Sequence, residues 1–237
     1  MARLDGRSAD QLRKINIVPD FLLHPAGSCL IEMGCTRVVC SATLEETVPS
    51  FLKGSGKGWL TAEYGMLPGC SDQRVNRERS KVGGRTQEIQ RLIGRALRSC
   101  IDLKMLGERS ILIDCDVLDA DGGTRTAAIT GSFVALALAL RALGKSNPAL
   151  ASAIKSSVAA VSVGLVGGEP LLDLNYEEDK RADVDMNIVK ISDGRFVEVQ
   201  GTAEATPFSH DQLNHLLHLA SLGIDRLLEQ QRKVLNW

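Results

Sequence analysis

Two turns in the chain join a glycine pair to an arginine directly before a predicted helix. The first runs from Gly83 to Thr86 in the order Gly-Gly-Arg-Thr, and the second runs from Asp121 to Thr126 in the order Asp-Gly-Gly-Thr-Arg-Thr. Glycine lets the backbone approach a ligand closely, a helix N-terminus presents unpaired N–H groups, and the planar fork of arginine suits phosphate oxygens. Either turn alone is equally typical of a solvated loop, but two such turns in one chain favour a phosphate site.

An acidic stretch between residues 173 and 187 is a second candidate for chemistry, with six acids against two bases. Asp183 and Asp185 alternate at the start of a predicted strand and so share one face, and Asp179 lies in a preceding loop that could fold back toward it. Carboxylate oxygens suit Mg²⁺, which takes one or two of them plus a substrate phosphate, whereas a protonated carboxyl could act as a general acid. The spacing alone favours a solvated acidic loop.

Basic residues gather between positions 74 and 98, where eight of them stand against two acids. The whole chain has a formal net charge of −1, so any RNA-binding surface must be a local patch. Arg91, Arg95 and Arg98 lie on one helical stripe, which is typical of a solvated face. A loop before that helix carries three further arginines, whose spacing predicts contacts with phosphates: Arg74, Arg77 and Arg79.

The elements that must position these residues are read from composition and periodicity. The chain has 237 residues, of which 44% are hydrophobic and only 4% aromatic, so Leu, Ile, Val and Ala must build the core. The patterns predict strands over 15–18, 29–48, 59–66, 110–118, 158–166, 169–174, 184–191 and 196–200. They predict helices from Gln87 to Ile101, from about Thr126 to Leu143, and from an N-cap at Ser209 to the end of the chain. Hairpin turns at 167–168 and 193–194 indicate one α/β domain over 1–237 with mostly antiparallel sheets.

Several classes of protein are excluded by local features. The charged N-terminus lacks the apolar run of a secretory signal, and the apolar run 127–143 is too short and too polar-flanked for a membrane span. Six cysteines form no CxxC pair and mostly lie inside apolar patterns, which favours reduced thiols in a cytoplasmic protein.

These segments, in this order, resemble the ribonuclease PH family. The resemblance begins at Asp5-Gly6-Arg7 and covers about residues 3–230, with further blocks at 11–13, 58–68, 83–95, 114–117, 121–127, 159–164, 196–204 and 207–209. It implies a duplicated βαβα domain of the α/β (α+β) class, with mixed or antiparallel sheets and a long C-terminal helix. It also implies a homo-oligomer, a hexameric ring built as a trimer of dimers. The implied activity is phosphorolytic 3′→5′ trimming of RNA, notably of tRNA precursors, and the reverse reaction adds nucleotides from diphosphates.

The resemblance assigns roles residue by residue. Arg85 and the turn Gly123-Thr124-Arg125 match positions that bind inorganic phosphate, the co-substrate. Asp179 and Asp185 match the paired acids near Mg²⁺ and the scissile bond. Arg74 and Arg77 match loop arginines used for tRNA or ring contacts; with Arg79, and with no apolar anchor in the loop, we expect them to contact the double-helical body of tRNA away from the catalytic centre.

Two departures and two alternatives accompany this interpretation. Gly69 stands where the family has a basic residue, and Asn175 stands where it has an acid. One alternative is a non-catalytic RNA-binding ring subunit, but such subunits lose the arginines or the acids that this chain keeps. The other is a small-molecule kinase on a related fold, for which no glycine-rich triphosphate loop is present.

Overall fold

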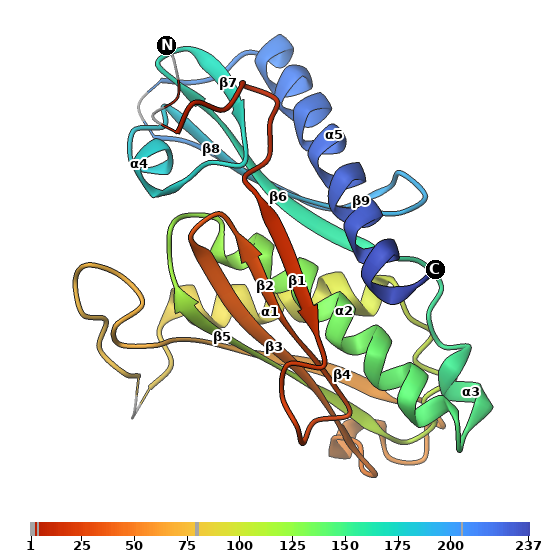
Figure 1. Cartoon of the computed structure of the whole chain (residues 1–237). Coiled ribbons are helices and arrows are strands. Elements are labelled where there is room, and N and C mark those ends of the chain that lie inside the picture. The colour runs from red at the N-terminus through yellow and green to blue at the C-terminus, as the bar shows by residue number, and fades with distance from the viewer. Residues whose placement is uncertain (1–2, 4, 79–80, 205) are drawn as a thin grey trace.

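Alternating apolar and polar side chains in the first half of the chain build a five-stranded sheet (Figure 1). The computed structural model describes residues 3, 5–78, 81–204 and 206–237. The strands are β1 (Ile15–Pro19), β2 (Gly27–Met33), β3 (Thr36–Glu45), β4 (Trp59–Met66) and β5 (Ser110–Asp119), in the spatial order β1-β2-β3-β5-β4. All neighbouring pairs are antiparallel except β4 and β5, which run parallel. These two strands therefore end at the same edge of the sheet, and a glycine turn follows each of them.

The second half forms a four-stranded antiparallel sheet in the order β7-β6-β8-β9. Its strands are β6 (Val158–Val166), β7 (Glu169–Leu172), β8 (Val184–Ile191) and β9 (Phe196–Ala203). The predicted hairpin turns are confirmed, since the glycines at 167, 168 and 194 all have positive φ angles. The prediction of mostly antiparallel sheets is confirmed as well.

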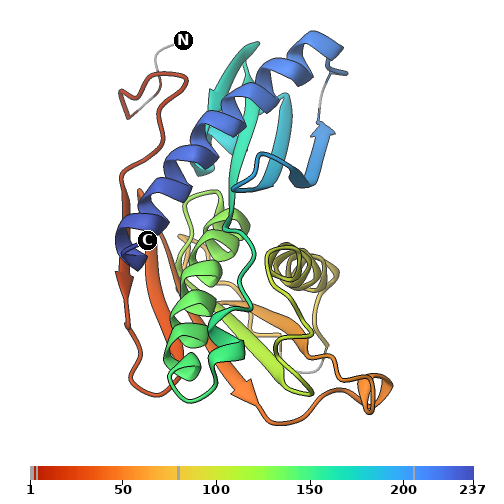
Figure 2. The ribbon, with the colours of Figure 1, turned by 90° about the vertical axis from the view of Figure 1, so that its right-hand side faces the viewer.

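Two helices fill the layer between the sheets. α1 (Gly84–Ser99) packs against β4 and reaches β9, and α2 (Thr124–Gly144) packs against β2 and β3 on one side and β6 on the other (Figures 1 and 2). The predicted apolar face of α1 is buried, and each fully buried Leu or Ile contributes about 1.5–3 kcal/mol. The long C-terminal helix α5 (His210–Leu235) packs along β6 and β7 and contacts β1. It starts, as predicted, at Ser209, whose side chain forms a capping box with Gln212.

α2 is apolar around its whole circumference because both sheets cover it. Its 21 residues extend beyond the predicted apolar run 127–143, and by length and composition alone they could cross a membrane. However, 72% of an apolar 18-residue stretch of this helix is buried inside the protein, as is typical of a core helix. One hydrophobic core runs continuously from the first sheet through α2 to the second sheet and α5.

The elements that the sequence did not predict are short. The expected strand 29–48 is a hairpin, because Gly34 takes a left-handed conformation between β2 and β3. Three single-turn helices were also missed: η1 (Ser50–Leu52), α3 (Pro148–Ala151) and α4 (Tyr176–Asp179). All six cysteines are free thiols, and five of them are buried, as expected.

Candidate active site

A cleft of about 1000 Å³ opens where the N-termini of α1 and α2 meet α4 and β8. It collects seven of the nine residues to which the sequence analysis assigned a role in binding phosphate, Mg²⁺ or RNA, although they come from five separate segments. These seven are Arg74, Arg85, Gly123, Thr124, Arg125, Asp179 and Asp185. Arg77 does not line the cleft, and Arg79 lies outside the described residues.

Both helices that point into the cleft lack a side-chain cap. α1 begins after Gly83 and α2 after Gly123, and neither N-cap residue offers a side-chain acceptor to the first N–H groups. α5, by contrast, has a complete capping box. The first amides of α1 and α2, together with the positive ends of the helix dipoles, are therefore left to bind an anion.

The turn before α2 can only be made from glycine. Gly122 and Gly123 have φ angles of +74° and +66°, which strain any L side chain. A Cβ on Gly122 would also lie 2.7 Å from the carbonyl oxygen of Leu174. Close packing against the chain before α4 therefore fixes the backbone of the predicted phosphate turn.

A buried ion pair supports this turn from behind. Arg13 donates to the carbonyl oxygens of Asp121 and Gly122, and its Nη2 lies 2.7 Å from Oδ1 of Asp173. Asp173 is fully buried and has a left-handed backbone with φ of 56°. Breaking a buried pair of this kind leaves an uncompensated charge, so both residues are structural determinants of the site.

The hydroxyl of Thr124 is oriented by a buried tyrosine. Tyr64 on β4 donates its phenol hydrogen to Oγ1 of Thr124 over 2.9 Å. Burial raises the pKa of Tyr64, which keeps the phenol protonated and able to donate. The Thr124 hydroxyl hydrogen is then left to point at a ligand in the cleft.

Arg85 and Arg125 supply the positive charge. The side chain of Arg85 has no hydrogen-bond or ion-pair acceptor among the residues that the structure describes. The side chain of Arg125 is only 16% exposed and makes a 3.4 Å ion pair with Glu88 of α1. The two guanidinium groups share the cleft with the acids, since the positive charge of each opposes the rise that burial causes in the pKa of Asp179 and of Asp185.

Asp179 and Asp185 form a carboxylate pair, and neither makes an ion pair with a cationic side chain in the described part of the chain. Burial and then the charge of Asp179 raise the pKa of Asp185 to about 6, against the opposing effect of Arg125. Desolvation also raises the pKa of Asp179. Oδ1 of Asp185 is buried and accepts no hydrogen bond from any described residue. Such an orphaned oxygen needs a partner from outside the protein.

These two acids fit a hard divalent cation. Within the described part of the chain, no three His, Cys, Asp or Glu side chains gather as a complete metal cage. Mg²⁺ does not need such a cage, because it binds through one or two carboxylates and keeps waters or substrate phosphates as its other ligands. Asp183, the third acid that the sequence placed near this face, does not line the cleft.

The loop between β4 and α1 differs from its predicted description. Cys70 is buried and Val75 packs against the core, so the expectation of a loop without apolar anchors is wrong. Backbone hydrogen bonds from Cys70 to Leu67 and from Ala120 to Cys70 fold the start of the loop over the strand ends. Arg74 thus lies in the cleft rather than away from it.

Arg77 lies farther along the same loop, near Asp116 on β5. Burial and the charge of Asp114 raise the pKa of Asp116, and the positive charge of Arg77 opposes this rise. The loop therefore presents Arg74 to the cleft and Arg77 toward Asp116 on β5.

Sequence reasoning missed several polar residues that line the cleft, namely Ser162, Tyr176, Lys180 and Asn187. Asn187 had a usable signal, because it alternates with Asp185 along β8 and so shares its face. Ser162 had none, since it lies within an otherwise apolar strand and pairs with Asn187 only through the β6–β8 register.

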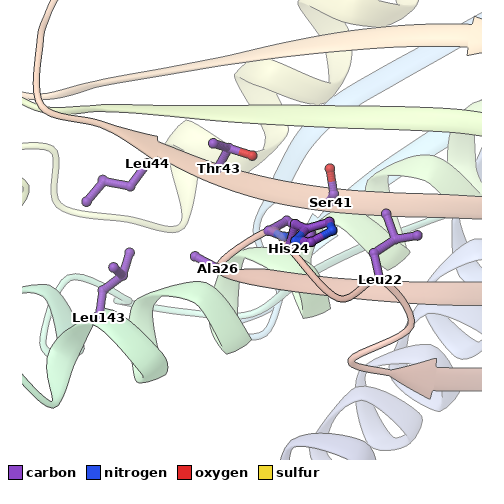
Figure 3. A pocket seen from close by; sticks show the side chains of 8 residues that line it. Leu22, His24, Ala26, Ser41, Thr43, Leu44 and Leu143 are labelled. Atoms are coloured by element: carbon purple, nitrogen blue, oxygen red, sulfur yellow. The ribbon is translucent and has the colours of Figure 1, made fainter.

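A second hollow, of about 550 Å³, lies at the other end of β2 and β3 (Figure 3). Its lining combines apolar side chains with His24, Ser41 and Thr43, and it contains no charged pair or arginine. The chemistry of an anionic substrate therefore belongs to the larger cleft.

A sheet-and-helix fold with an anion-binding cleft at two helix N-termini and an adjacent acid pair defines a class of phosphate-handling enzymes. A sequence model of the 3′ exoribonuclease family, domain 1, matches residues 11–141, and domain 2 of the same family matches residues 156–222. The chain belongs to this family. The hydrophobic core is continuous through the two sheets, but the family is described as two domains. A single domain over 1–237 therefore stays a prediction.

Its relatives include ribonuclease PH of Bacillus velezensis, 57% identical over 99% of this chain and 97% of that one. Ribonuclease PH of Crocosphaera subtropica is 56% identical over 99% of this chain and 98% of its own. The chain is accordingly a phosphorolytic 3′→5′ exoribonuclease, as the sequence predicted. The Archaeoglobus fulgidus exosome with RNA bound to the active site has the same fold, with a TM-score of 0.80, 22% identity and coverage of 96% and 92%.

Proposed function

We propose that the cleft binds inorganic phosphate beside the 3′ end of RNA and that the natural substrates include tRNA precursors. The observation that carries this proposal is the convergence of Arg85, Arg125 and two uncapped helix N-termini on the Asp179–Asp185 pair. Positive groups and carboxylates that line one cleft suit a reaction between two anions that also needs a cation at the leaving group.

The reaction asks the protein mainly for charge neutralisation and alignment. An oxygen of the bound phosphate forms a bond to the phosphorus of the terminal phosphodiester. The bond from that phosphorus to the 3′ oxygen of the preceding nucleotide breaks, and this oxygen takes up a proton. The products are a nucleoside diphosphate and an RNA shorter by one nucleotide.

Arg85, Arg125, the Thr124 hydroxyl and the first amides of α1 and α2 hold the attacking phosphate in this proposal. Charge-assisted hydrogen bonds are the strong ones, and fixed donors cost no reorganisation during the reaction. Holding both reactants in one cleft turns a bimolecular encounter into an oriented attack.

Asp179 and Asp185 bind Mg²⁺ in this proposal, with the orphaned Oδ1 of Asp185 as one ligand. A Mg²⁺ ion held by these two carboxylates would supply positive charge to the phosphoryl and leaving oxygens. A cation beside the pair also favours the ionised form of Asp185, which the protein alone disfavours. The other role left open by the sequence, a protonated Asp185 that donates to the leaving 3′ oxygen, predicts the opposite pH dependence.

Arg74 lines the cleft, Arg77 lies farther along the same loop, and Arg79 lies outside the described residues. We assign these arginines to RNA phosphates. The ribonuclease PH resemblance further supports a hexameric ring, a trimer of dimers, and the buried free thiols suit a cytoplasmic enzyme.

The proposal is tested by incubating a short RNA and a tRNA precursor with the protein, each with and without inorganic phosphate. Shortening should require phosphate and Mg²⁺ and should release nucleoside diphosphates. With nucleoside diphosphates in excess, the same protein should lengthen RNA. Phosphate-independent release of monophosphates would show that water, rather than phosphate, is the attacking group.

A further inference from the structure

Two side chains from two other elements meet at the guanidinium group of Arg125 and form a hydrogen-bonded triangle with it. Nη1 of Arg125 donates to Oε1 of Gln200 over 3.1 Å and to Oε1 of Glu88 over 3.4 Å. Gln200 closes the triangle, because its Nε2 donates to the same Glu88 oxygen over 2.7 Å. Arg125 lies in the first turn of α2, Glu88 lies on α1 and Gln200 lies on β9.

The triangle engages only one nitrogen of the guanidinium group. Among the described residues, Nε and Nη2 of Arg125 have no hydrogen-bond acceptor. These two nitrogens form one edge of the planar fork, the edge that matches two oxygens of a phosphate. Arg125 lines the cleft, while Glu88 and Gln200 do not. The protein therefore holds the rear of the guanidinium and leaves its bidentate edge for the ligand.

We infer that Gln200 and Glu88 are positioning residues for inorganic phosphate, and that they act by fixing the orientation of Arg125. This inference rests on the proposed role of Arg125 as a phosphate ligand. Gln200 is central because its amide both accepts from Arg125 and donates to Glu88, so one side chain fixes both partners. Without it, Arg125 would regain rotamer freedom that must be lost again when phosphate binds.

A neighbouring ion pair supplies a matched control. Glu198 also lies on β9 and pairs with Arg95 of α1 over 3.2 Å. It joins the same strand to the same helix, but it has no hydrogen bond or ion pair with Arg125. If the triangle served only to hold β9 against α1, removing either interaction should have the same effect.

The main test variant is Gln200→Met, which keeps an unbranched side chain, removes both hydrogen bonds and leaves the net charge unchanged. Because the charge is constant, a change in phosphate affinity cannot be a general electrostatic effect. The KM for phosphate and the Kd of inorganic phosphate for the RNA-free protein should rise roughly 2- to 13-fold, the range for losing about one hydrogen bond. The KM for a short RNA should stay within about twofold of that of the unaltered protein, and Glu198→Gln should leave all three quantities unchanged.

A double variant separates positioning from a direct role. Gln200→Met combined with Arg125→Ala should bind phosphate no more weakly than Arg125→Ala alone, because Gln200 acts only through Arg125. Additive losses, or equal effects of Gln200→Met and Glu198→Gln, would overturn the inference. Calorimetry with inorganic phosphate on the unaltered protein comes first. If phosphate does not bind, the proposed phosphate site itself is wrong. If phosphate binds equally well to the unaltered protein and to Gln200→Met, only the positioning role is wrong.

Discussion

Asp185 on β8 and Asp179 at the end of α4 line the same cleft and repel each other electrostatically. Burial is the main reason that the pKa of Asp185 rises to about 6, and the negative charge of Asp179 is the second. The two residues are six positions apart in sequence and belong to different elements. A carboxylate with this pKa changes its charge close to physiological pH. The pair therefore gives the site a measurable signature as well as a candidate cation site.

The pH dependence of activity should show which form of Asp185 works. If the ionised form binds Mg²⁺, kcat/KM should fall as the pH drops through about 6, and higher Mg²⁺ should move this limb to lower pH because the cation favours the carboxylate. A general acid would instead lose activity as the pH rises above the same value. The measurement is a pH profile at two Mg²⁺ concentrations with a short unstructured RNA.

Asp185→Asn should abolish degradation and diphosphate-driven synthesis together, since both directions cross one transition state. Asp179→Asn should shift the Mg²⁺ dependence to higher concentration. RNA affinity should survive in both variants, because it depends mainly on arginines. Near-normal turnover of Asp185→Asn in either direction would remove this residue from the catalytic machinery.

The same Asp185→Asn change should stabilise the metal-free fold at pH 8. The folded state binds the Asp185 proton more tightly than the unfolded state, whose pKa is near 3.8, so stability falls as the pH rises from about 4 to about 6 and stays lower above that. Two pKa units correspond to at most roughly 3 kcal/mol, and the buried amide of Asn offsets part of that, which leaves a gain of about 1 kcal/mol. Urea unfolding at pH 8 and pH 4 tests this: the gain should be present at pH 8 and nearly absent at pH 4. A destabilised variant at pH 8 would mean that the carboxylate has a stabilising partner in the free protein.

Arg85→Ala and Arg125→Ala should act on phosphate rather than on RNA. Each removes charge-assisted hydrogen bonds that contribute about 1.5–3 kcal/mol, which corresponds to roughly 10- to 150-fold in kcat/KM for phosphate. The affinity of the free enzyme for RNA should change much less. Equal losses for phosphate and RNA would show that these arginines bind the RNA backbone.

Replacing Arg74 and replacing Arg77 should affect different substrates. Arg74 lines the cleft, so Arg74→Ala should slow the degradation of even a short oligonucleotide. Arg77→Ala should spare that substrate but bind tRNA more weakly, with a salt slope shallower by about 0.7–0.9 for each RNA phosphate that the variant no longer binds. The oligomer size of each variant must be measured alongside, because a dissociated ring would make the loop an assembly element.

Local sequence patterns were enough to predict the main helices and strands and many residues of the cleft. The three- and four-residue spacing of apolar side chains marked α1, and the two glycine turns marked where the anion-binding amides would lie. The hairpin at Gly34 and the single-turn helix α4 were missed because such short features have almost no periodicity.

Partners far apart in the sequence could not be predicted from it. The Arg13–Asp173 pair and the Arg125–Gln200 hydrogen bond join the two halves of the chain, and each depends on how the sheets pack around α2. The predicted position of Arg74 was wrong for a related reason. Nothing in the sequence around Cys70 indicates that this residue is buried, and its burial places the loop over the strand ends.

The most direct test of phosphorolysis in this cleft follows the phosphate itself. The protein is incubated with a short RNA, Mg²⁺ and ¹⁸O-labelled inorganic phosphate, and the released nucleotides are analysed by mass spectrometry. Attack by bound phosphate should give nucleoside diphosphates that carry the label in the terminal phosphate group. At a phosphate concentration below the KM, Arg125→Ala should form this product roughly 10- to 150-fold more slowly. Unlabelled nucleoside monophosphates as the sole product would contradict this mechanism.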